Sequence, residues 1–229
     1  MVNADMWALY EQHVSRTRLL HYLDAAAGDR GSAIELYDWS VRVSAEWWWA
    51  LGHLEVALRN AIDKTLMLRH LKHGREGHWI FDHERELGRD AGKGAHRHAF
   101  PYADVAVAIE RVRRNGKSVD AGQIISETSF GFWHQLVSRR QMFLWPDLAN
   151  AFPGMPGRNQ SLVSARVTRL RDLRNRVGHH HRIWALDLDR RLADLRDVAT
   201  FIDPRLWTLL EAGSNLPELL RDRPLPSES

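Results

Sequence analysis

Residues 174–181 read RNRVGHHH, and they place an arginine and an asparagine just ahead of consecutive histidines. Imidazole groups accept and donate protons near neutral pH, and the planar guanidinium of arginine binds phosphate oxygens in pairs. Two imidazoles beside one phosphate would supply both a general base and a general acid. The segment is therefore a candidate site for acid–base chemistry at a phosphate, built from Arg174, Asn175, His179, His180 and His181.

The hydrophobic pattern indicates that residues 159–178 form the helix that positions Arg174. Its apolar stripe consists of Val163, Val167, Leu170 and Val177. Arg174 falls in the middle of this stripe, where a guanidinium that cannot lose its proton needs an anion or several acceptors. Two interpretations stay open: Arg174 extends toward solvent or pairs with a buried acid such as Glu55, or it binds a ligand phosphate.

Arg174 and His179 do not share a face of an ideal helix. His179 follows Arg174 by five positions and lies about 140° away from it, whereas His181 returns to the arginine's face. Either the helix ends or distorts at Gly178, so that His179 swings round, or the arginine and the histidine that act together come from two subunits. A helix C-terminus stabilised by cationic side chains is the purely structural alternative.

Composition limits the other kinds of chemistry. The chain has 229 residues, enough for one domain over 1–222 followed by a disordered tail at 223–229. The absence of cysteine excludes disulfides and thiol catalysis. The 13 histidines leave a metal site as an alternative, but no HExxH pattern occurs, so we predict neither a metal nor a cofactor. The histidines of that weaker alternative lie in or beside loops: His70, His73, His96 and His98.

The formal net charge is only +3, so local clustering of charge matters more than the total. One basic cluster stands out against the single acid Asp172, and it consists of Arg166, Arg169, Arg171, Arg174 and Arg176. Such a run is either a solvated helix face or a nucleic-acid contact.

Helical periodicity runs along most of the chain, which predicts an all-α fold. One helix is expected over 5–26, and a second from Ser32, as its N-cap, to Lys72 with a break or bend at Gly52. Residues 74–103, rich in Gly and His, are expected to form a long, partly ordered loop. The remaining predictions are a helix at 103–114, two short helices joined near Ser129 and Gly131 and closed by Pro146, and helices at 159–178 and 187–202.

Three adjacent tryptophans, Trp47, Trp48 and Trp49, span most of a helix circumference. Such a helix either packs on several sides or exposes aromatic surface at a subunit interface. The N-terminus has no basic segment followed by an apolar run, so we expect a cytoplasmic protein without a membrane span.

The segment LRNRVGHH resembles the R-x4-6-H motif, with a polar residue after the arginine, of the HEPN superfamily of helical proteins. Within that superfamily the chain is similar to the Abi-like (abortive infection) proteins of bacteria. Two further segments agree in kind and order: GHLEVALRNAIDKTL at 52–66 and SFGFWHQLVSRRQMFLWPDLANAFPG at 129–154. Together the segments cover about half the chain.

The resemblance implies a HEPN-type helical bundle with additional helices, and a homodimer that cuts RNA without a metal ion in phage defence or a toxin–antitoxin system. It implies that Arg174 holds the scissile phosphate, that Asn175 is a polar side chain with an orienting role, and that His179 transfers the proton, with His180 beside it. It also allows an antitoxin or regulatory protein as partner. The alternative is a non-catalytic HEPN-type module that binds RNA or a nucleotide.

Abi-like proteins often carry an acidic residue after the paired histidines, whereas this chain has His181 and Arg182. His179, His180 and His181 therefore all remain candidates for proton transfer. Glu55 and Arg59 have the spacing of an intrahelical ion pair. Together with Asn60, they either support the structure, or position Arg174 or contact RNA as a second layer that includes Arg176 and His181.

Overall fold

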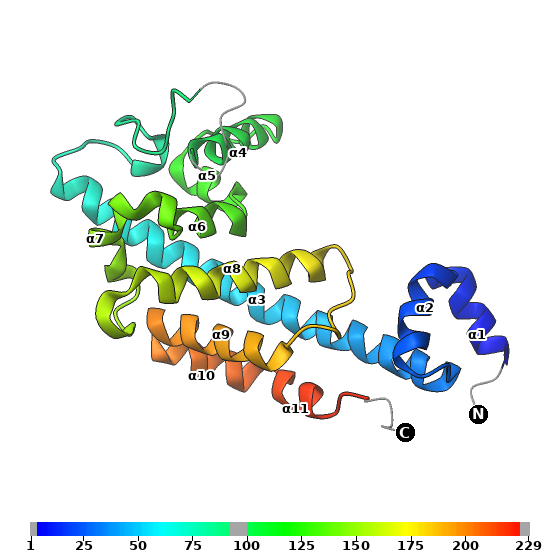
Figure 1. Cartoon of the computed structure of the whole chain (residues 1–229). Helices are drawn as coiled ribbons and strands as arrows, with labels where there is room; N and C mark the ends of the chain where they lie inside the picture. Colours follow the sequence, from blue (N-terminus) through cyan, green and yellow to red (C-terminus); the bar gives the residue numbers. More distant parts are fainter. Residues whose placement is uncertain (1–3, 92–99, 225–229) are drawn as a thin grey trace.

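The computed structural model describes residues 4–91 and 100–224. Within these residues the regular elements are helices, and no β-strand occurs. This confirms the predicted all-α class. The helices pack around one central helix, and the two described chain ends lie toward the same side of the molecule (Figure 1).

The central helix is α3, Arg30–Lys72, whose 43 residues extend for about 65 Å. It carries one continuous stripe of buried side chains, which includes Val43, Trp47, Leu51, Leu54, Leu58 and Ile62. Helices α2, α7, α8, α9 and α11 all pack against it, so α3 forms the axis of a single core.

The start of α3 and its course past Gly52 differ from the sequence prediction. The N-cap is Asp29, which accepts a hydrogen bond of 2.7 Å from the backbone N–H of Ser32. Aspartate caps a helix as well as serine does, so the helix begins earlier than predicted. Of the break or bend predicted at Gly52, the break is wrong, because α3 continues through this residue. A glycine costs a helix about 1 kcal/mol, and burial of the neighbouring Leu51 and Leu54 outweighs that cost.

The predicted N-terminal helix at 5–26 is interrupted. It consists of α1 (Ala4–Tyr10), a π-helical turn η1 (Glu11–Ser15) and α2 (Arg16–Ala25). Ser15 has a φ of 81°, which ends the first segment, and its hydroxyl then accepts the N–H of Arg18 at the start of α2. The hydrophobic periodicity is continuous across this break, so it could not reveal it. Figure 1 shows α1 and α2 at the N-terminal end of α3.

Part of the predicted loop at 74–103 is described, and Glu86 and Asp82 hold it in place. Glu86 accepts paired hydrogen bonds from both Arg69 and Arg75. Asp82 accepts the backbone N–H groups of Leu87 and Arg89. A short 3-10 turn, η2, covers Trp79–Phe81. Residues 92–99, which include His96 and His98, lie outside the described residues, as does the predicted tail from residue 225 onward.

Short helices follow this segment: α4 (Tyr102–Arg114), α5 (Ala121–Glu127), α6 (Phe130–Leu136), η4 (Arg139–Leu144), α7 (Trp145–Leu148), η5 (Ala149–Ala151) and η6 (Pro156–Arg158). The predictions at 103–114 and on both sides of Ser129 are confirmed. Pro146, however, opens α7 and does not close the preceding helices. Proline fits the first turn of a helix because its missing N–H has no intrahelical partner there.

The C-terminal part contains α8 (Gln160–Gly178), α9 (Leu188–Ile202), α10 (Pro204–Gly213) and α11 (Leu216–Arg221). The first two confirm the predicted helices, and the last two lie beyond the predicted ones. Helix α8 packs between α3 and α9, and α10 packs on α9. Trp39 of α3 donates its indole N–H to the carbonyl of Leu219, which attaches α11.

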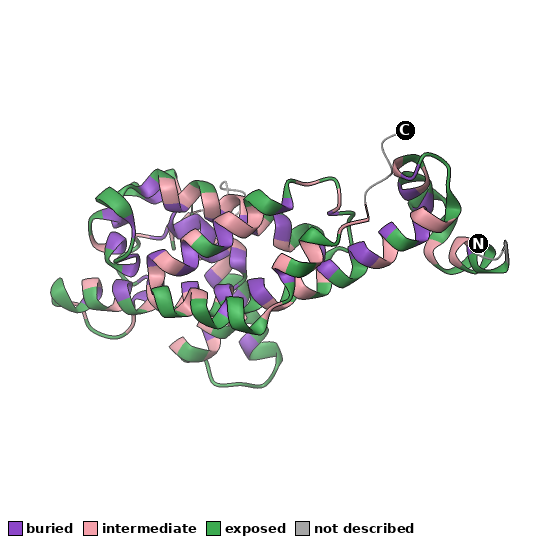
Figure 2. Ribbon diagram, turned by 90° about the horizontal axis from the view of Figure 1, so that it is seen from below, coloured by how far each residue is buried: buried purple, intermediate pink, exposed green. Residues whose placement is uncertain are grey.

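Figure 2 shows the buried residues concentrated where the helices face one another, with exposed residues on their outer sides. In the ranges 4–91 and 100–224, no helix combines the length and apolar character that crossing a membrane requires.

Candidate functional site

Arg174 emerges from the buried stripe of α8 as predicted. The apolar stripe residues Val163, Val167, Leu170 and Val177 are all buried, and the Arg174 side chain in their midst is 33% exposed. The backbone of α8 therefore forces the base of the side chain into the α3–α8 contact, while the guanidinium reaches its edge. Both parts of the structural interpretation, an extended side chain and an acidic partner, apply to this residue.

The guanidinium lies between a carboxylate and an aromatic ring, both on α3. Its Nε is 3.8 Å from Oε2 of Glu55, and its central carbon lies 5.1 Å from the ring centroid of Trp48. Arg59, one turn after Glu55, contacts the same carboxylate at 3.6 Å, which confirms the predicted ion pair. Glu55 is thus the ion-pair partner of both Arg59 and Arg174, and the ring of Trp48 lies flat beside Arg174.

Burial raises the pKa of the Glu55 carboxyl above its ordinary value, although the neighbouring Arg174 and Arg59, together with the backbone N–H of Phe130, act in the opposite direction. The environment of this acid is therefore poorly solvated. An ion pair in such a place is stronger than on an open surface, so Glu55 is suited to fixing the orientation of Arg174.

The Arg174 guanidinium retains its hydrogen-bonding capacity. Its contact with Glu55 is an ion pair at 3.8 Å, too long for a hydrogen bond, and no acceptor among the described residues has bonding geometry to it. A guanidinium carries five N–H donors. Arg174 is thus oriented by its neighbours while its donors stay available to an anion.

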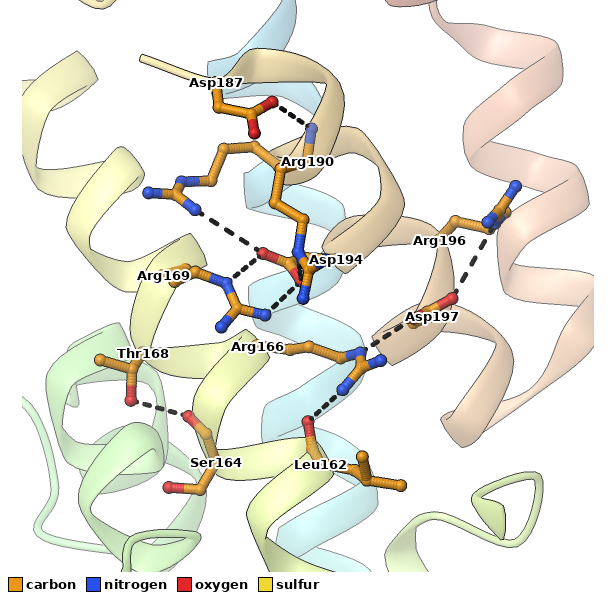
Figure 3. A network of polar contacts seen from close by, with 11 residues as sticks. Leu162, Ser164, Arg166, Thr168, Arg169, Asp187, Arg190, Asp194, Arg196 and Asp197 are labelled. Carbon is orange, nitrogen blue, oxygen red and sulfur yellow. Dashed lines mark hydrogen bonds and ion pairs between the residues drawn. The ribbon is translucent and has the colours of Figure 1, made fainter.

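Its neighbours in the basic cluster are used differently (Figure 3). Arg166 donates to Asp197 at 2.9 Å, and Arg169 makes two bonds of 2.6 Å to the buried Asp194, so both join α8 to α9. Arg171 donates to Asp172 at 2.7 Å. Arg166 and Arg169 therefore stabilise the packing of α8 against α9, and Arg171 pairs within α8, so these three guanidinium groups are not unpaired on a solvated helix face.

Arg171 also contacts His134, a buried residue that the sequence pattern did not indicate. It donates to Nδ1 of the buried His134, whose Nε2 lies 3.0 Å from the Thr168 hydroxyl. The Thr168 hydroxyl itself donates to the carbonyl of Ser164, so it accepts from Nε2 of His134. Only the packing of α6 against α8 brings these groups together.

The helix α8 ends at Gly178, with His179 as its C-cap. The residue in the left-handed region is His180, with a φ of 52°, and not Gly178. The N–H groups of His179, His180 and His181 donate to the carbonyls of Asn175, Val177 and Arg176, which closes the helix end. His179 keeps the i→i−4 bond of the helix, so the chain leaves the helix path at His180, one residue later than the first of the two predicted solutions requires.

All three histidines are exposed, and the rings of His179 and His181 lie 5.8 Å apart between centroids. A Cβ at Gly178 would lie 3.8 Å from Nη1 of Arg174, so the guanidinium reaches the residue that precedes His179. His180 instead offers its carbonyl to Arg18 of α2 at 2.9 Å. Asn175, Arg176 and Asn60 are exposed.

The tryptophan run is divided among the two predicted roles. Trp47 is fully buried, and Trp49 is half-buried, with its ring 4.5 Å from that of His53. Trp48 is 49% exposed and lies beside Arg174. Trp48 is about 100° around α3 from Trp47, so its ring lies at the flank of the buried stripe, on the side that faces Arg174 of α8.

Across the part of the chain that the structure describes, no three histidine or acidic side chains are grouped as metal ligands would be. Of the histidines considered for a metal, His70 is buried and bonds the carbonyl of Glu76, and His73 is exposed at the end of α3.

Comparison with known proteins gives no significant match: no protein-family model, no curated protein and no solved structure is similar to this chain.

Proposed function

We propose that this chain is a metal-independent endoribonuclease of the HEPN type. The observation that carries the proposal is the state of Arg174: Glu55 and Trp48 orient it, its donors are free, and a cluster of exposed histidines begins at the adjacent helix end. RNA is proposed as the substrate because LRNRVGHH resembles the superfamily motif.

The proposed reaction uses the 2′-hydroxyl of the substrate as nucleophile. One imidazole removes the proton of this hydroxyl, and its oxygen attacks the adjacent phosphorus. Arg174 stabilises the charge on the phosphorane oxygens, which exceeds that of the ground state. A second imidazole protonates the departing 5′-oxygen, so the products are a 2′,3′-cyclic phosphate and a free 5′-hydroxyl. His179 is the first candidate for proton transfer, with His180 and His181 as the others.

A homodimer completes this proposal. One chain contributes a single Arg174, and a two-fold axis beside α8 would place two copies of RNRVGHH around one phosphate. The half-exposed Trp48 and the exposed Asn175 would then face the partner or the RNA. A role in phage defence or a toxin–antitoxin system, on cytoplasmic RNA and under control of an antitoxin, is the biological part of the same proposal.

One observation favours a second candidate, a non-catalytic module that binds RNA or a nucleotide. The pair of Arg174 and the exposed Trp48 is a suitable platform for a phosphate and a base, and it needs no histidine.

The test is incubation of the purified protein with mixed RNA in EDTA. His179→Ala serves as the inactive variant, and His73→Ala, an exposed histidine at the far end of α3, is the matched control. The proposal requires cleavage that survives chelation, is lost in His179→Ala and persists in His73→Ala. Binding without cleavage by the wild-type protein would favour the second candidate, and loss of cleavage with EDTA would overturn the proposal.

A further inference from the structure

Two adjoining hollows lie between the N-terminal helix α2 and the histidine segment. Arg18 Nη1 donates a hydrogen bond of 2.9 Å to the carbonyl of His180, and this bond joins α2 to the histidine segment where the two hollows meet. One hollow has a volume of about 480 Å³ and the other about 660 Å³, and both are lined by Arg18, Tyr22, His180 and His181. Each volume is within the ordinary range for ligand sites, about 300–1,000 Å³.

The smaller hollow is cationic. Its basic lining residues are Arg18, Arg176, Arg182, His21, His180 and His181. The hydroxyls of Ser15 and Thr17 complete the wall, and no carboxylate belongs to the described residues that line it. This contrasts with the arginines between α8 and α9, which aspartates neutralise. A concave surface that gathers donors without acids has the chemistry of a phosphate site.

The larger hollow is mainly apolar and aromatic. Tyr37 and Trp48 of α3 line it together with Tyr22 of α2, and Val41 lies between them on α3. The Tyr22 and Tyr37 rings meet edge to face at 5.3 Å, and Trp184 supports Tyr22 from behind at 6.0 Å. Tyr22 is buried, whereas Trp48 is 49% exposed. Again, no described lining residue is acidic.

Trp48 connects this groove to the candidate catalytic arginine, because the same ring lines the groove and lies against Arg174. A chain of groups thus extends from the cationic hollow, past Arg18 and the histidines, along the aromatic groove to Arg174. Alternation of cationic and aromatic groups is how proteins bind single-stranded nucleic acid: bases stack on rings, and arginines neutralise phosphates.

We propose that the two hollows form a binding subsite for single-stranded RNA beside the scissile phosphate. The aromatic groove takes an unpaired base against Trp48 and Tyr37, and the cationic hollow takes an adjacent phosphate through Arg18 and Arg182. The subsite rests on the proposed ribonuclease function for the identity of its ligand, but its binding does not require cleavage.

The experiment measures fluorescence anisotropy of a labelled single-stranded 2′-O-methyl oligoribonucleotide, which lacks the nucleophilic hydroxyl, over a series of salt concentrations. The variants are Trp48→Ala and Tyr37→Ala in the groove, and Arg18→Ala and Arg182→Ala in the hollow. Phe143→Ala and Arg114→Ala are matched controls, since Phe143 is 48% exposed and Arg114 is exposed, and neither lines the hollows. Arg182→Ala keeps the Arg18 bond to His180, so it remains informative if Arg18→Ala disturbs the loop.

Trp48→Ala should weaken binding about 10-fold or more without changing its salt dependence, because a stacked base is lost. Each arginine variant should weaken binding and reduce the slope of log affinity against log salt by about 0.7, the value for one phosphate on a single strand. Unchanged affinity in all four variants, or equal losses in the two controls, would overturn the subsite. Cleavage that depends on His179 but not on Trp48 or Arg182 would also overturn it while leaving the proposed function intact. Binding with these dependences and no cleavage of ordinary RNA would support the subsite and remove the proposed function.

Discussion

The guanidinium of Arg174 lies over the ring of Trp48, 5.1 Å from its centroid, and Gly178 closes the same contact from the helix end. A Cβ at Gly178 would lie 3.2 Å from Cζ3 of Trp48, closer than ordinary packing. Glu55 approaches the guanidinium at 3.8 Å. The arrangement fixes a cation at the edge of the core without using its hydrogen-bond donors.

Replacement of Arg174 by alanine should reduce RNA cleavage by about 10²–10³, the usual cost of losing a group that stabilises developing charge. The helical circular dichroism signal should persist, because the side chain is a third exposed and its stripe neighbours stay in place. Lysine at this position should not restore cleavage, since a point charge does not reproduce the planar fork. Unfolding of both Arg174→Ala and Glu55→Ala would indicate a structural role instead.

Glu55→Gln should change how stability depends on pH. Burial raises the pKa of Glu55 in the folded protein, so the folded state binds its proton more tightly than the unfolded state does. The stability that the Glu55 carboxyl adds to the folded state is therefore fully present below the ordinary pKa of this group, and it is lost as pH rises through the raised pKa. Wild-type protein should lose stability across that window relative to Glu55→Gln, as urea unfolding at a series of pH values would measure. Parallel curves for the two proteins would contradict the assignment.

Glu86→Gln should change the pH dependence of stability in the opposite sense to Glu55→Gln. Hydrogen bonds from Arg69, with help from Arg75, lower the pKa of Glu86 to about 2. Its contribution is present above the ordinary glutamate pKa and is lost as pH falls toward that value. At neutral pH the variant should be less stable by about 1 kcal/mol after allowance for solvent screening. The difference should vanish near pH 2. Glu84→Gln, at an exposed position in the same segment, is the control and should show neither effect.

Mixing inactive Arg174→Ala protein with inactive His179→Ala protein tests the composite dimer site. If one chain supplies the arginine and its partner the histidine, each heterodimer regains one of its two sites, so random exchange in an equal mixture should restore about a quarter of the wild-type sites. The measurement is cleavage after exchange, with heterodimer formation followed by differently tagged chains. A monomer in sedimentation that still cleaves RNA would rule out the composite site.

Helical periodicity was sufficient to predict α3, α8 and α9, and also the position of Arg174 in an apolar stripe. These features depend on residue spacing along one helix, which the sequence states directly. The same periodicity missed the interruption at Ser15 and wrongly placed a break at Gly52, because local backbone choices depend on capping and on the packing that surrounds them.

Only the tertiary structure decided which charges and rings are free. It paired Arg166 and Arg169 with acids of α9, left the donors of Arg174 open, and exposed Trp48 while burying Trp47. It also brought Arg18 to the carbonyl of His180 across most of the chain length. These contacts arise where helices distant in sequence pack together, so their partners are set by the three-dimensional arrangement and cannot be derived from the spacing within any one segment.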